Sequence, residues 1–393
     1  MRIRLVLLIL TITAPLFAYA EGGVLGFIKK VGTTIDSMTV RGVDRRYVDM
    51  PEKPWQVILQ GNVNRSELNM DAMVDGKRLM KDTNSDLDWA PRFSTPVSTY
   101  IGVWAGYRGY GFGYSKNVSG GDGRVFKFGL IGSSYGVSFR AHSFSTQKPT
   151  VDMSGYLPEW KNMTIDYQLQ DPMRVRLMTF DGYYLFNGKH YSYTAAFDQS
   201  VIQRRSSGSP MVGGMYYHST IDYSRGNNGD FIYLMNDIGK MKHYQLSLGG
   251  GYAYNWVPCK GLLVSGLGMV LLTVFNRLDV WHYNSKFRQK ALEEDKDPDT
   301  LLEEANSLKN LDKAERDKQI GDLFKIWPME DNYYERQHSR VIPVIDARLS
   351  VTYNVGDWFF NANAQLYHFS FRYEENQGRL VDWHINASGG IRF

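Results

Sequence analysis

Two short stretches of the sequence place a histidine and a serine two residues apart, His190-Tyr191-Ser192 and His368-Phe369-Ser370. Residues two apart on a β-strand point to the same side, so each pair could supply a general base and a nucleophile for ester hydrolysis. Lipid-hydrolysing barrels use such a pair, but their pattern adds an Asn-Gly after the serine and a third polar partner, and neither is found here. We therefore favour a non-enzymatic protein and keep a lipid hydrolase that uses His190 and Ser192 as the alternative.

A second set of residues that could have a function is a group of charged side chains. The expected strand alternation turns them toward one side: Arg140, Arg174, Arg176, Arg348, Asp346 and Asp382. Inside an open barrel, inward arginines would favour the passage of anions. The same charges could instead form a salt-bridged network that fills a narrow barrel, and we favour this second interpretation. The sequence holds no phosphate-binding loop, nucleotide fingerprint or metal-ligand constellation, so we expect no cofactor and no metal.

The composition narrows the class of protein. The 393 residues include 14% aromatic side chains, 38 Gly and one Cys, and the net charge is +4. That charge is too small to indicate a nucleic-acid partner. A single cysteine, Cys259, excludes an intramolecular disulfide and a multi-cysteine metal site. Abundant aromatic residues and glycines with few helix-forming runs indicate many strands.

The first twenty residues have the pattern of a cleavable export signal. Met1–Arg4 holds two arginines, Leu5–Ile12 is apolar, and Ala18-Tyr19-Ala20 fits a cleavage site. We expect residues 1–20 to be removed, which leaves a mature chain that begins near Glu21. The most apolar later stretch, Leu262–Phe275, is too short for a transmembrane helix.

Strict alternation of apolar and polar residues marks three segments, His243–Trp256, Val344–Tyr353 and Val381–Phe393. A membrane-spanning strand needs roughly 9–11 such residues. Tyr and Trp gather at the strand ends, where their rings suit a membrane–water interface better than the polar outer face of a soluble sandwich. The expected fold is all-β: a transmembrane antiparallel β-barrel of about 12 strands, within a range of about 10–14, with one helical loop insertion.

Nine further segments complete the predicted strands: Trp55–Asn64, Val97–Ser115, Arg124–Ile131, Ser134–His142, Met173–Phe186, His190–Asp198, Met211–Asp222, Leu262–Phe275 and Trp358–Tyr373. Val97–Ser115 changes its apolar parity near Arg108-Gly109, which predicts a bulge. Asn187-Gly188 predicts a two-residue hairpin. These assignments conflict with one another, because they put the long stretch Ser143–Pro172 at the opposite end of the barrel from the other long connections.

The chain outside the strands divides into three parts. Residues 21–54 are predicted to be a periplasmic N-terminal extension, and residues 55–393 the barrel. Residues 285–327 form a charged insertion with Leu302, Ala305, Leu308 and Leu311 at helical spacing. We favour a lid on the barrel mouth for this insertion over a binding element for a surface partner.

The end of the chain, with Ile391 two residues before the terminal Phe393, matches the signal that the barrel assembly machinery reads on outer-membrane barrels. Together with the export signal it predicts a protein of the outer membrane of a Gram-negative bacterium, in contact with the lipid of that membrane. The function expected from these features is a narrow or plugged channel, or the membrane component of a surface complex. The alternatives are the lipid hydrolase and a structural or adhesive barrel that binds partners through its loops.

One part of the sequence is specific enough to suggest a family. The residues are Tyr184–Asn187, Tyr191–Phe197, Gln199-Ser200 and Gln203–Ser209, with Trp55 and Gly251–Trp256. Together they resemble the exported bacterial family catalogued as domain of unknown function 4421, over Trp55 to Phe393. The chain departs from that family at Thr194, where Pro is frequent, and in the charged insertion. The resemblance implies a barrel and no established activity.

The same resemblance marks a polar segment between two predicted strands, with Phe197, Gln199, Ser200, Gln203, Arg204, Ser206 and Ser209. The segment is more polar than a turn needs. It could fold into the lumen as a plug, or bind a ligand or partner. It could equally be a structural turn that hydrogen-bonds to the barrel wall.

Overall fold

The structure is a computed structural model that describes residues 42–71, 92–152, 154, 162–225, 228–235, 237–294, 318, 322, 325–329, 334–338, 343–373 and 376–393. The predicted export signal, most of the N-terminal extension, and Leu302 to Leu311 of the insertion lie outside these residues. Among the residues that the structure describes, no helix is long and apolar enough to cross a membrane.

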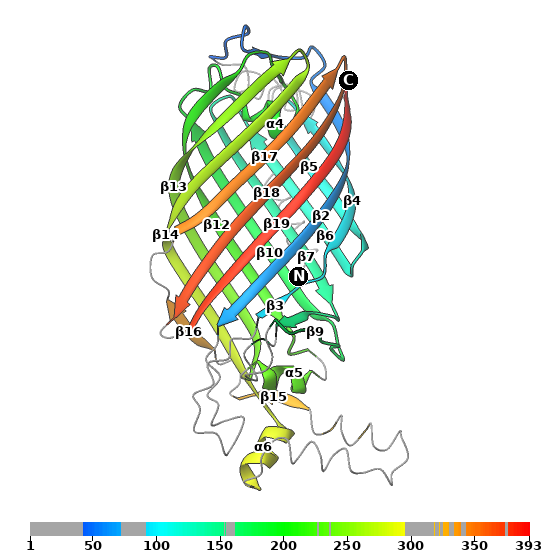
Figure 1. Cartoon of the computed structure of the whole chain (residues 1–393), viewed down its shortest axis with the longest axis vertical. Helices are drawn as coiled ribbons and strands as arrows, with labels where there is room; N and C mark the ends of the chain where they lie inside the picture. Colours follow the sequence, from blue (N-terminus) through cyan, green and yellow to red (C-terminus); the bar gives the residue numbers. More distant parts are fainter. Residues whose placement is uncertain are drawn as a thin grey trace, which may run out of the picture.

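Twelve antiparallel strands form a closed barrel, which confirms the predicted fold class and strand number (Figure 1). They are β2 (Trp55–Asp71), β4 (Ser98–Tyr107), β5 (Tyr110–Ser119), β6 (Asp122–Ile131), β7 (Tyr135–Thr146), β10 (Met173–Leu185), β12 (Ser207–Asp222), β13 (Ile238–Cys259), β14 (Leu262–Ser285), β17 (Pro343–Val355), β18 (Trp358–Tyr373) and β19 (Asn376–Arg392). The last strand, β19, pairs with the first, β2, so the wall has no free edge.

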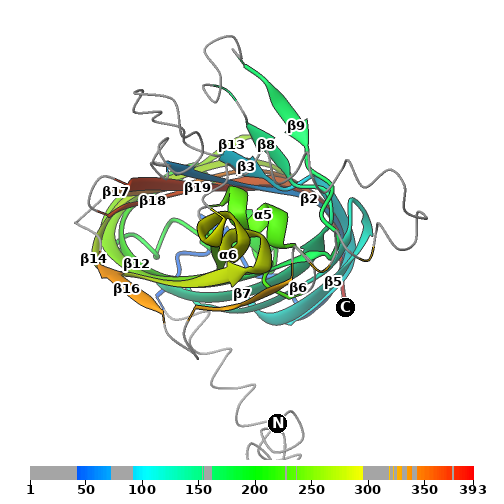
Figure 2. The ribbon, with the colours of Figure 1, turned by 90° about the horizontal axis from the view of Figure 1, so that it is seen from below.

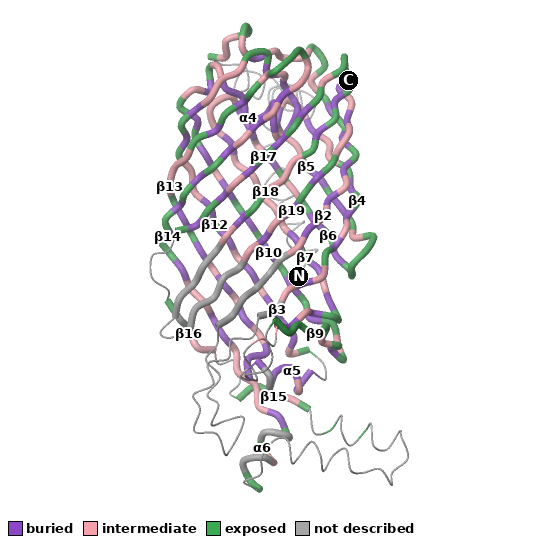
Figure 3. The backbone as a smooth tube through the Cα atoms, in the orientation of Figure 1, coloured by how far each residue is buried: buried purple, intermediate pink, exposed green. Residues whose placement is uncertain are grey.

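The wall alternates as the sequence predicts, with one face of each strand exposed and the other buried (Figure 3). The outer face is a belt of exposed apolar side chains, among which Trp55 is 51% and Leu349 65% exposed. Aromatic members of this belt gather near the strand ends that lie beside Phe393: Trp55, Tyr184, Phe186, Tyr252, Tyr254, Trp256, Tyr353, Trp358 and Phe360. Such a band is typical of barrels at a membrane–water interface.

The two ends of the barrel differ. The end beside Phe393 has four tight connections, at 108–109, 132–134, 260–261 and 356–357, and is called the short-turn end. The opposite, long-loop end carries the remaining long connections that the structure describes, with β3 (Arg92–Ser94), β8 (Thr150–Asp152), β9 (Thr164–Asp166), α5 (Gly229–Leu234), α6 (Lys286–Glu293), β15 (Ile326–Pro328) and β16 (Glu335–His338). Helix α6 projects beyond the barrel at this end (Figure 1).

Two predicted strands were wrong, and the two errors cancel in the strand count. Val97–Ser115 is the hairpin β4–β5, because Arg108 and Gly109 have φ of 51° and 89° and form a two-residue turn with both φ positive. His190–Asp198 is not a strand but contains α4 (Tyr193–Phe197). With both corrected, the stretch 147–172 joins the other long connections at the long-loop end, and the conflict between the ends disappears.

The inside of the barrel is filled unevenly. Inward side chains of β10, β12, β13 and β14 form an apolar core that includes Leu177, Met215 and Met269. Helix α5 adds Phe231 and Ile232 to this core, and it lies within the outline of the barrel when seen from the long-loop end (Figure 2). The inward faces of β2, β18 and β19 are instead polar, with buried Gln60, Asn62, Asn64, Asn361, His384 and Asn386.

Candidate functional site

The connection between β10 and β12 folds back into the barrel at the short-turn end. This stretch, residues 186–206, is called the plug segment, and it contains α4 and β11 (Ile202–Gln203). Helix α4 begins at Ser192, whose hydroxyl accepts a hydrogen bond from the Ala195 amide at 3.2 Å. The helix ends at Phe197, and Gln199, two residues later, has a φ of 62° and an amide that donates to the Thr194 carbonyl at 2.5 Å.

Wall side chains hold the end of α4 through its backbone. The Ala196 carbonyl accepts hydrogen bonds from Ser350 Oγ at 2.6 Å, Asn361 Nδ2 at 3.2 Å and Thr352 Oγ1 at 3.5 Å. All three donors are buried on the inward faces of β17 and β18. The last turn of this helix leaves carbonyl groups without helical partners, so the wall supplies the donors that they need.

Arg392, the last residue of β19, holds the plug segment through its guanidinium. Its Nη2 and Nε donate to the Gln199 carbonyl at 2.7 and 3.0 Å, and its Nη2 also donates to Asn354 Oδ1 at 2.6 Å. On the other side, Gln56 Nε2 donates to the Asp198 carbonyl at 2.9 Å. Burial raises the pKa of the Asp198 carboxyl to about 6, while hydrogen bonds from Ser200 and Gln56 act in the opposite direction. The plug segment is therefore joined to β2 as well as to β17, β18 and β19.

The polar residues that the sequence singled out lie in or beside the plug segment. Gln199, Ser200, Gln203 and Ser209 are buried, while Arg204 is exposed. The Gln203 side chain accepts hydrogen bonds from the Ser192 amide and from Asn255 Nδ2, both at 3.0 Å, and donates to the His190 carbonyl at 2.7 Å. These contacts are internal to the fold and organise the plug segment.

Two more of these residues contact the rim of the barrel. The Ser206 hydroxyl accepts a hydrogen bond from the Val257 amide at 2.9 Å. Ser209 Oγ accepts from the Asn187 amide at 3.0 Å and donates to the Pro210 carbonyl at 2.7 Å.

The N-terminal extension also meets the plug segment. Strand β1 (Val48–Asp49) pairs with β11, and Arg204 donates from its side chain to Asp49 at 2.6 Å. Val48 packs with Ala195, Ala196 and Val201 in a small apolar cluster. The described part of the extension therefore lies against the plug segment.

The predicted catalytic pair is not assembled. The expectation placed His190 and Ser192 on one strand, but they lie in the turn before α4, where alternation does not apply. His190 Nδ1 lies 3.0 Å from Asn187 Oδ1, and its Nε2 lies 3.6 Å from Asp44. Arg46 lowers the pKa of Asp44 through hydrogen bonds to its carboxylate. Ser192 is 7% exposed, and its hydroxyl is the cap of α4.

Both residues of this pair can be tested by substitution. We expect His190→Ala to leave hydrolysis of a phospholipid or lipopolysaccharide ester at the background rate of empty micelles, as in the wild type. Ser192→Ala should cost about 1 kcal/mol of stability, because an N-cap is lost. The measurement is ester release from purified, folded protein. Wild-type release that falls to background in His190→Ala would instead establish the hydrolase.

In the second histidine–serine pair, the histidine is on the outward-facing side of its strand. His368 has the parity of Trp358, Phe360 and Leu366 on β18, which are exposed on the outer face. The side chain of Ser370 lies outside what the structure describes.

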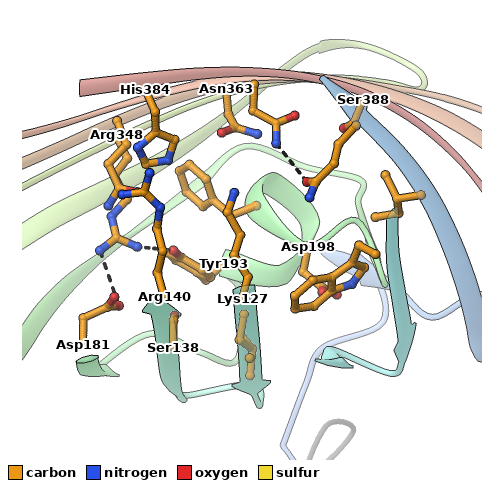
Figure 4. Close-up of a pocket in the computed structure, with 18 of the residues that line it drawn as sticks. Lys127, Ser138, Arg140, Asp181, Tyr193, Asp198, Arg348, Asn363, His384 and Ser388 are labelled. Carbon is orange, nitrogen blue, oxygen red and sulfur yellow. Dashed lines mark hydrogen bonds and ion pairs between the residues drawn. The ribbon is translucent and has the colours of Figure 1, made fainter. Parts of the chain in front are cut away.

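A cavity of about 160 Å³ lies inside the barrel between the plug segment and the polar side of the wall (Figure 4). Its lining includes charged residues from β6, β7, β10 and β17: Lys127, Arg140, Asp181 and Arg348. Tyr193, Phe197, Asp198 and Gln199 of the plug segment form the rest of one side. Among the residues that the structure describes, no cluster of His, Cys, Asp or Glu could hold a metal.

Arg348 is the centre of a buried ionic network on one side of this cavity. Its Nη2 lies 2.6 Å from Asp346 Oδ2 and 3.4 Å from Asp181 Oδ2. Its Nη1 donates to the Tyr193 hydroxyl at 2.5 Å, and Nη2 donates to the Tyr367 hydroxyl at 3.4 Å. The network thus links β10, β17 and β18 to α4.

Of the charges predicted to face inward, four do so and two do not. Arg348 and Asp346 belong to the buried network, and Arg140 pairs with Asp382 across the lumen at 3.1 Å. Arg174 and Arg176 are exposed on the outer face of β10, which corrects the prediction. The strand alternates as expected, but the buried set is Met173, Val175, Leu177 and the residues that follow at every second position, because the apolar core lies inside the barrel on this side.

Sequence reasoning missed three residues around the cavity, Lys127, Trp104 and His384. Trp104 lies over Gly111 and Gly113, where a Cβ would come within 2.8 Å of its ring. A lysine with inward parity in the segment Arg124–Ile131 was the available signal for Lys127. For His384, the signal was that it shares the polar face of the segment Val381–Phe393 with Asp382.

Comparison with solved structures finds other barrels of low similarity. The outer-membrane protease OmpT of Escherichia coli has 6% identity and a TM-score of 0.36, over 87% of this chain and 97% of that chain. The β domain of the Bordetella autotransporter BrkA has 10% identity and a TM-score of 0.32, over 86% and 100%. The toluene transporter TodX of P. putida has 8% identity and a TM-score of 0.24, over 91% and 94%. We draw no functional argument from likeness at this level.

Comparison of sequences is more specific. No curated protein matches the chain. One family model matches residues 43–382, which include the block Tyr191–Ser209 on which the resemblance rested. The match spans most of the barrel and confirms that resemblance. The chain belongs to the family described as Domain of unknown function (DUF4421).

Proposed function

We propose that this protein is a plugged channel of the outer membrane of a Gram-negative bacterium. The plug segment closes the lumen at the short-turn end, and solutes pass only when that segment is displaced. The belt of exposed apolar side chains around the closed wall supports the membrane location, because such a surface is stable in lipid and not in water. The outward Ile385 and the terminal Phe393 agree with the proposed recognition of β19 by the barrel assembly machinery.

The observation that carries the proposal is the way in which the plug segment is held. Wall side chains donate hydrogen bonds to the carbonyls of Ala196, Asp198 and Gln199, and the donors come from β2, β17, β18 and β19. Hydrogen bonds between neutral groups contribute about 0.5–1.5 kcal/mol each and those from the Arg392 guanidinium about 1.5–3 kcal/mol each, so we expect that this set can be broken without unfolding the barrel.

The polar half of the lumen supplies a path once the plug segment has moved. Gln60, Asn62, Asn64 and Asn386 are buried on β2 and β19. The amides of Gln60, Asn62 and Asn386 hydrogen-bond to neighbouring polar groups, and Asn64 Oδ1 accepts from Arg140 at 3.5 Å. Amide side chains are good partners for water, whereas the opposite side of the lumen is filled by the apolar core, to which α5 contributes Phe231 and Ile232. The path would therefore run along β2, β18 and β19.

The test is single-channel conductance in a planar bilayer. We expect the refolded, heat-modifiable wild type to show no steady open steps. A variant in which residues 193–199 are replaced by a Gly/Ser chain of equal length should show steady steps, because the wall donors lose their ordered partners. Replacing α6, residues 286–293, in the same way is the matched control and should stay silent. Steady steps in the wild type, or silence of a folded 193–199 variant, would refute the proposal.

A further inference from the structure

Two cations stand side by side on the wall of the internal cavity. Lys127 on β6 and Arg140 on β7 are direct cross-strand partners, and both line the cavity (Figure 4). Like charges directly opposite each other on a sheet are destabilising. Arg140 is compensated by Asp382 at 3.1 Å, but no described acidic side chain lies within 4.0 Å of the Lys127 ammonium. Lys127 is therefore the cation of this lining that has no carboxylate partner within 4.0 Å, since Arg140 and Arg348 both have one.

Two further polar groups on the cavity wall have unused hydrogen-bonding capacity. His384 is 4% exposed and faces the cavity from β19, and its Nδ1 has no hydrogen-bond partner. The indole Nε1 of Trp104 is also buried without a partner. A cation inside the barrel without a counter-charge, and buried polar groups without partners, are costly to the fold. An anion in the cavity would relieve that cost at both the ammonium and the N–H groups.

The size and lining of the cavity limit the anion that fits. The volume of about 160 Å³ is close to that of an engineered apolar cavity, of about 150 Å³, that binds one benzene molecule in another protein. Only one cation, Lys127, lacks a partner, since Arg140 and Arg348 are already paired with carboxylates. Ile58, Ile131 and Phe197 add apolar surface to the lining. A ligand with one negative charge and a compact hydrocarbon part therefore fits the site.

We propose that this cavity binds a small monocarboxylate. The carboxylate accepts hydrogen bonds from Lys127 Nζ and from the His384 imidazole, beside Arg140, and the hydrocarbon part contacts the apolar part of the lining. Binding at this site does not depend on the proposed channel function, because a barrel that never conducts would still hold the ligand.

The test is ¹⁹F NMR of the folded, detergent-solubilised full chain with 4-fluorobenzoate. We expect a bound resonance that is absent with empty micelles and with the neutral 4-fluorobenzamide. Lys127→Met, which keeps length and removes charge, should weaken binding at least tenfold, and His384→Gln should weaken it severalfold. Lys116→Met is the matched control, because Lys116 is exposed on the outer face of β5, and it should bind as the wild type does.

A second measurement separates a ligand site from a structural lysine. Without ligand, Lys127→Met should unfold at a higher urea concentration than the wild type, because a like-charge pair is removed. A structural lysine would give the opposite shift. The proposal is overturned if wild type and Lys127→Met bind 4-fluorobenzoate equally, if neither binds, or if equimolar chloride displaces the bound carboxylate.

Discussion

Replacing Arg348 with methionine is expected to lower the free energy of unfolding by about 3–5 kcal/mol. The guanidinium is buried and holds two carboxylates, those of Asp346 and Asp181. Without it, both carboxylates stay inside the barrel with no cation in contact. An uncompensated buried charge is the reason why removing one partner of a buried ion pair is strongly destabilising. The Tyr193 hydroxyl also loses its donor, so α4 should loosen as well. Urea unfolding in micelles, followed by tryptophan fluorescence and by heat-modifiable gel mobility, measures the loss.

A rescue experiment separates charge from packing. Adding Asp346→Asn and Asp181→Asn to Arg348→Met removes the unpaired charges, and most of the lost stability should return. Arg174→Met provides the matched control, since Arg174 is exposed on the outer face, and its effect should stay within about 0.5 kcal/mol. If the triple variant is no more stable than Arg348→Met, the ionic explanation fails.

The second large effect is expected at Arg392 and concerns conductance. In Arg392→Ala, the Gln199 carbonyl and the Asn354 side chain lose three hydrogen bonds from a cationic donor, each worth about 1.5–3 kcal/mol. The guanidinium also leaves the face of Phe359, from which it is now 4.6 Å. We expect steady open steps in a bilayer where the wild type is silent.

Graded substitutions sharpen this second experiment. Arg392→Lys keeps the charge but has a single terminal nitrogen, so it should open less often than Arg392→Ala. Arg176→Ala removes an arginine from the outer face and should remain closed. Silence of a folded Arg392→Ala barrel would show that this contact does not hold the plug segment.

The barrel itself could be predicted because its signal is local. In His243–Trp256 every second residue meets lipid and the others face inward, and the structure keeps that division throughout the segment. Membrane strands must alternate in this way, and each strand carries its own evidence in about ten residues. The number of strands followed from the same signal, although Val97–Ser115 and His190–Asp198 were assigned wrongly in opposite directions.

Those two errors have a physical cause in common. An Arg-Gly pair in a hairpin turn and an Arg-Gly pair in a β-bulge look alike in the sequence, since glycine permits both conformations. The stretch from Tyr191 to Phe197 alternates like a strand, yet its Tyr191 and Tyr193 are buried against the inside of the barrel rather than in lipid. Apolar periodicity does not distinguish these two surroundings.

The sequence by itself determined the membrane barrel, its family and the unusual polarity of the segment Gln199–Ser209. Only the tertiary structure decided that the plug segment enters the lumen, that Arg392 and Asn361 hold it there, and that Arg174 and Arg176 face outward. It also decided that Lys127, Arg140 and His384 share one cavity. Alternation is encoded between neighbours in the chain, whereas these contacts join residues up to hundreds of positions apart, and their partners are set by how the sheet closes.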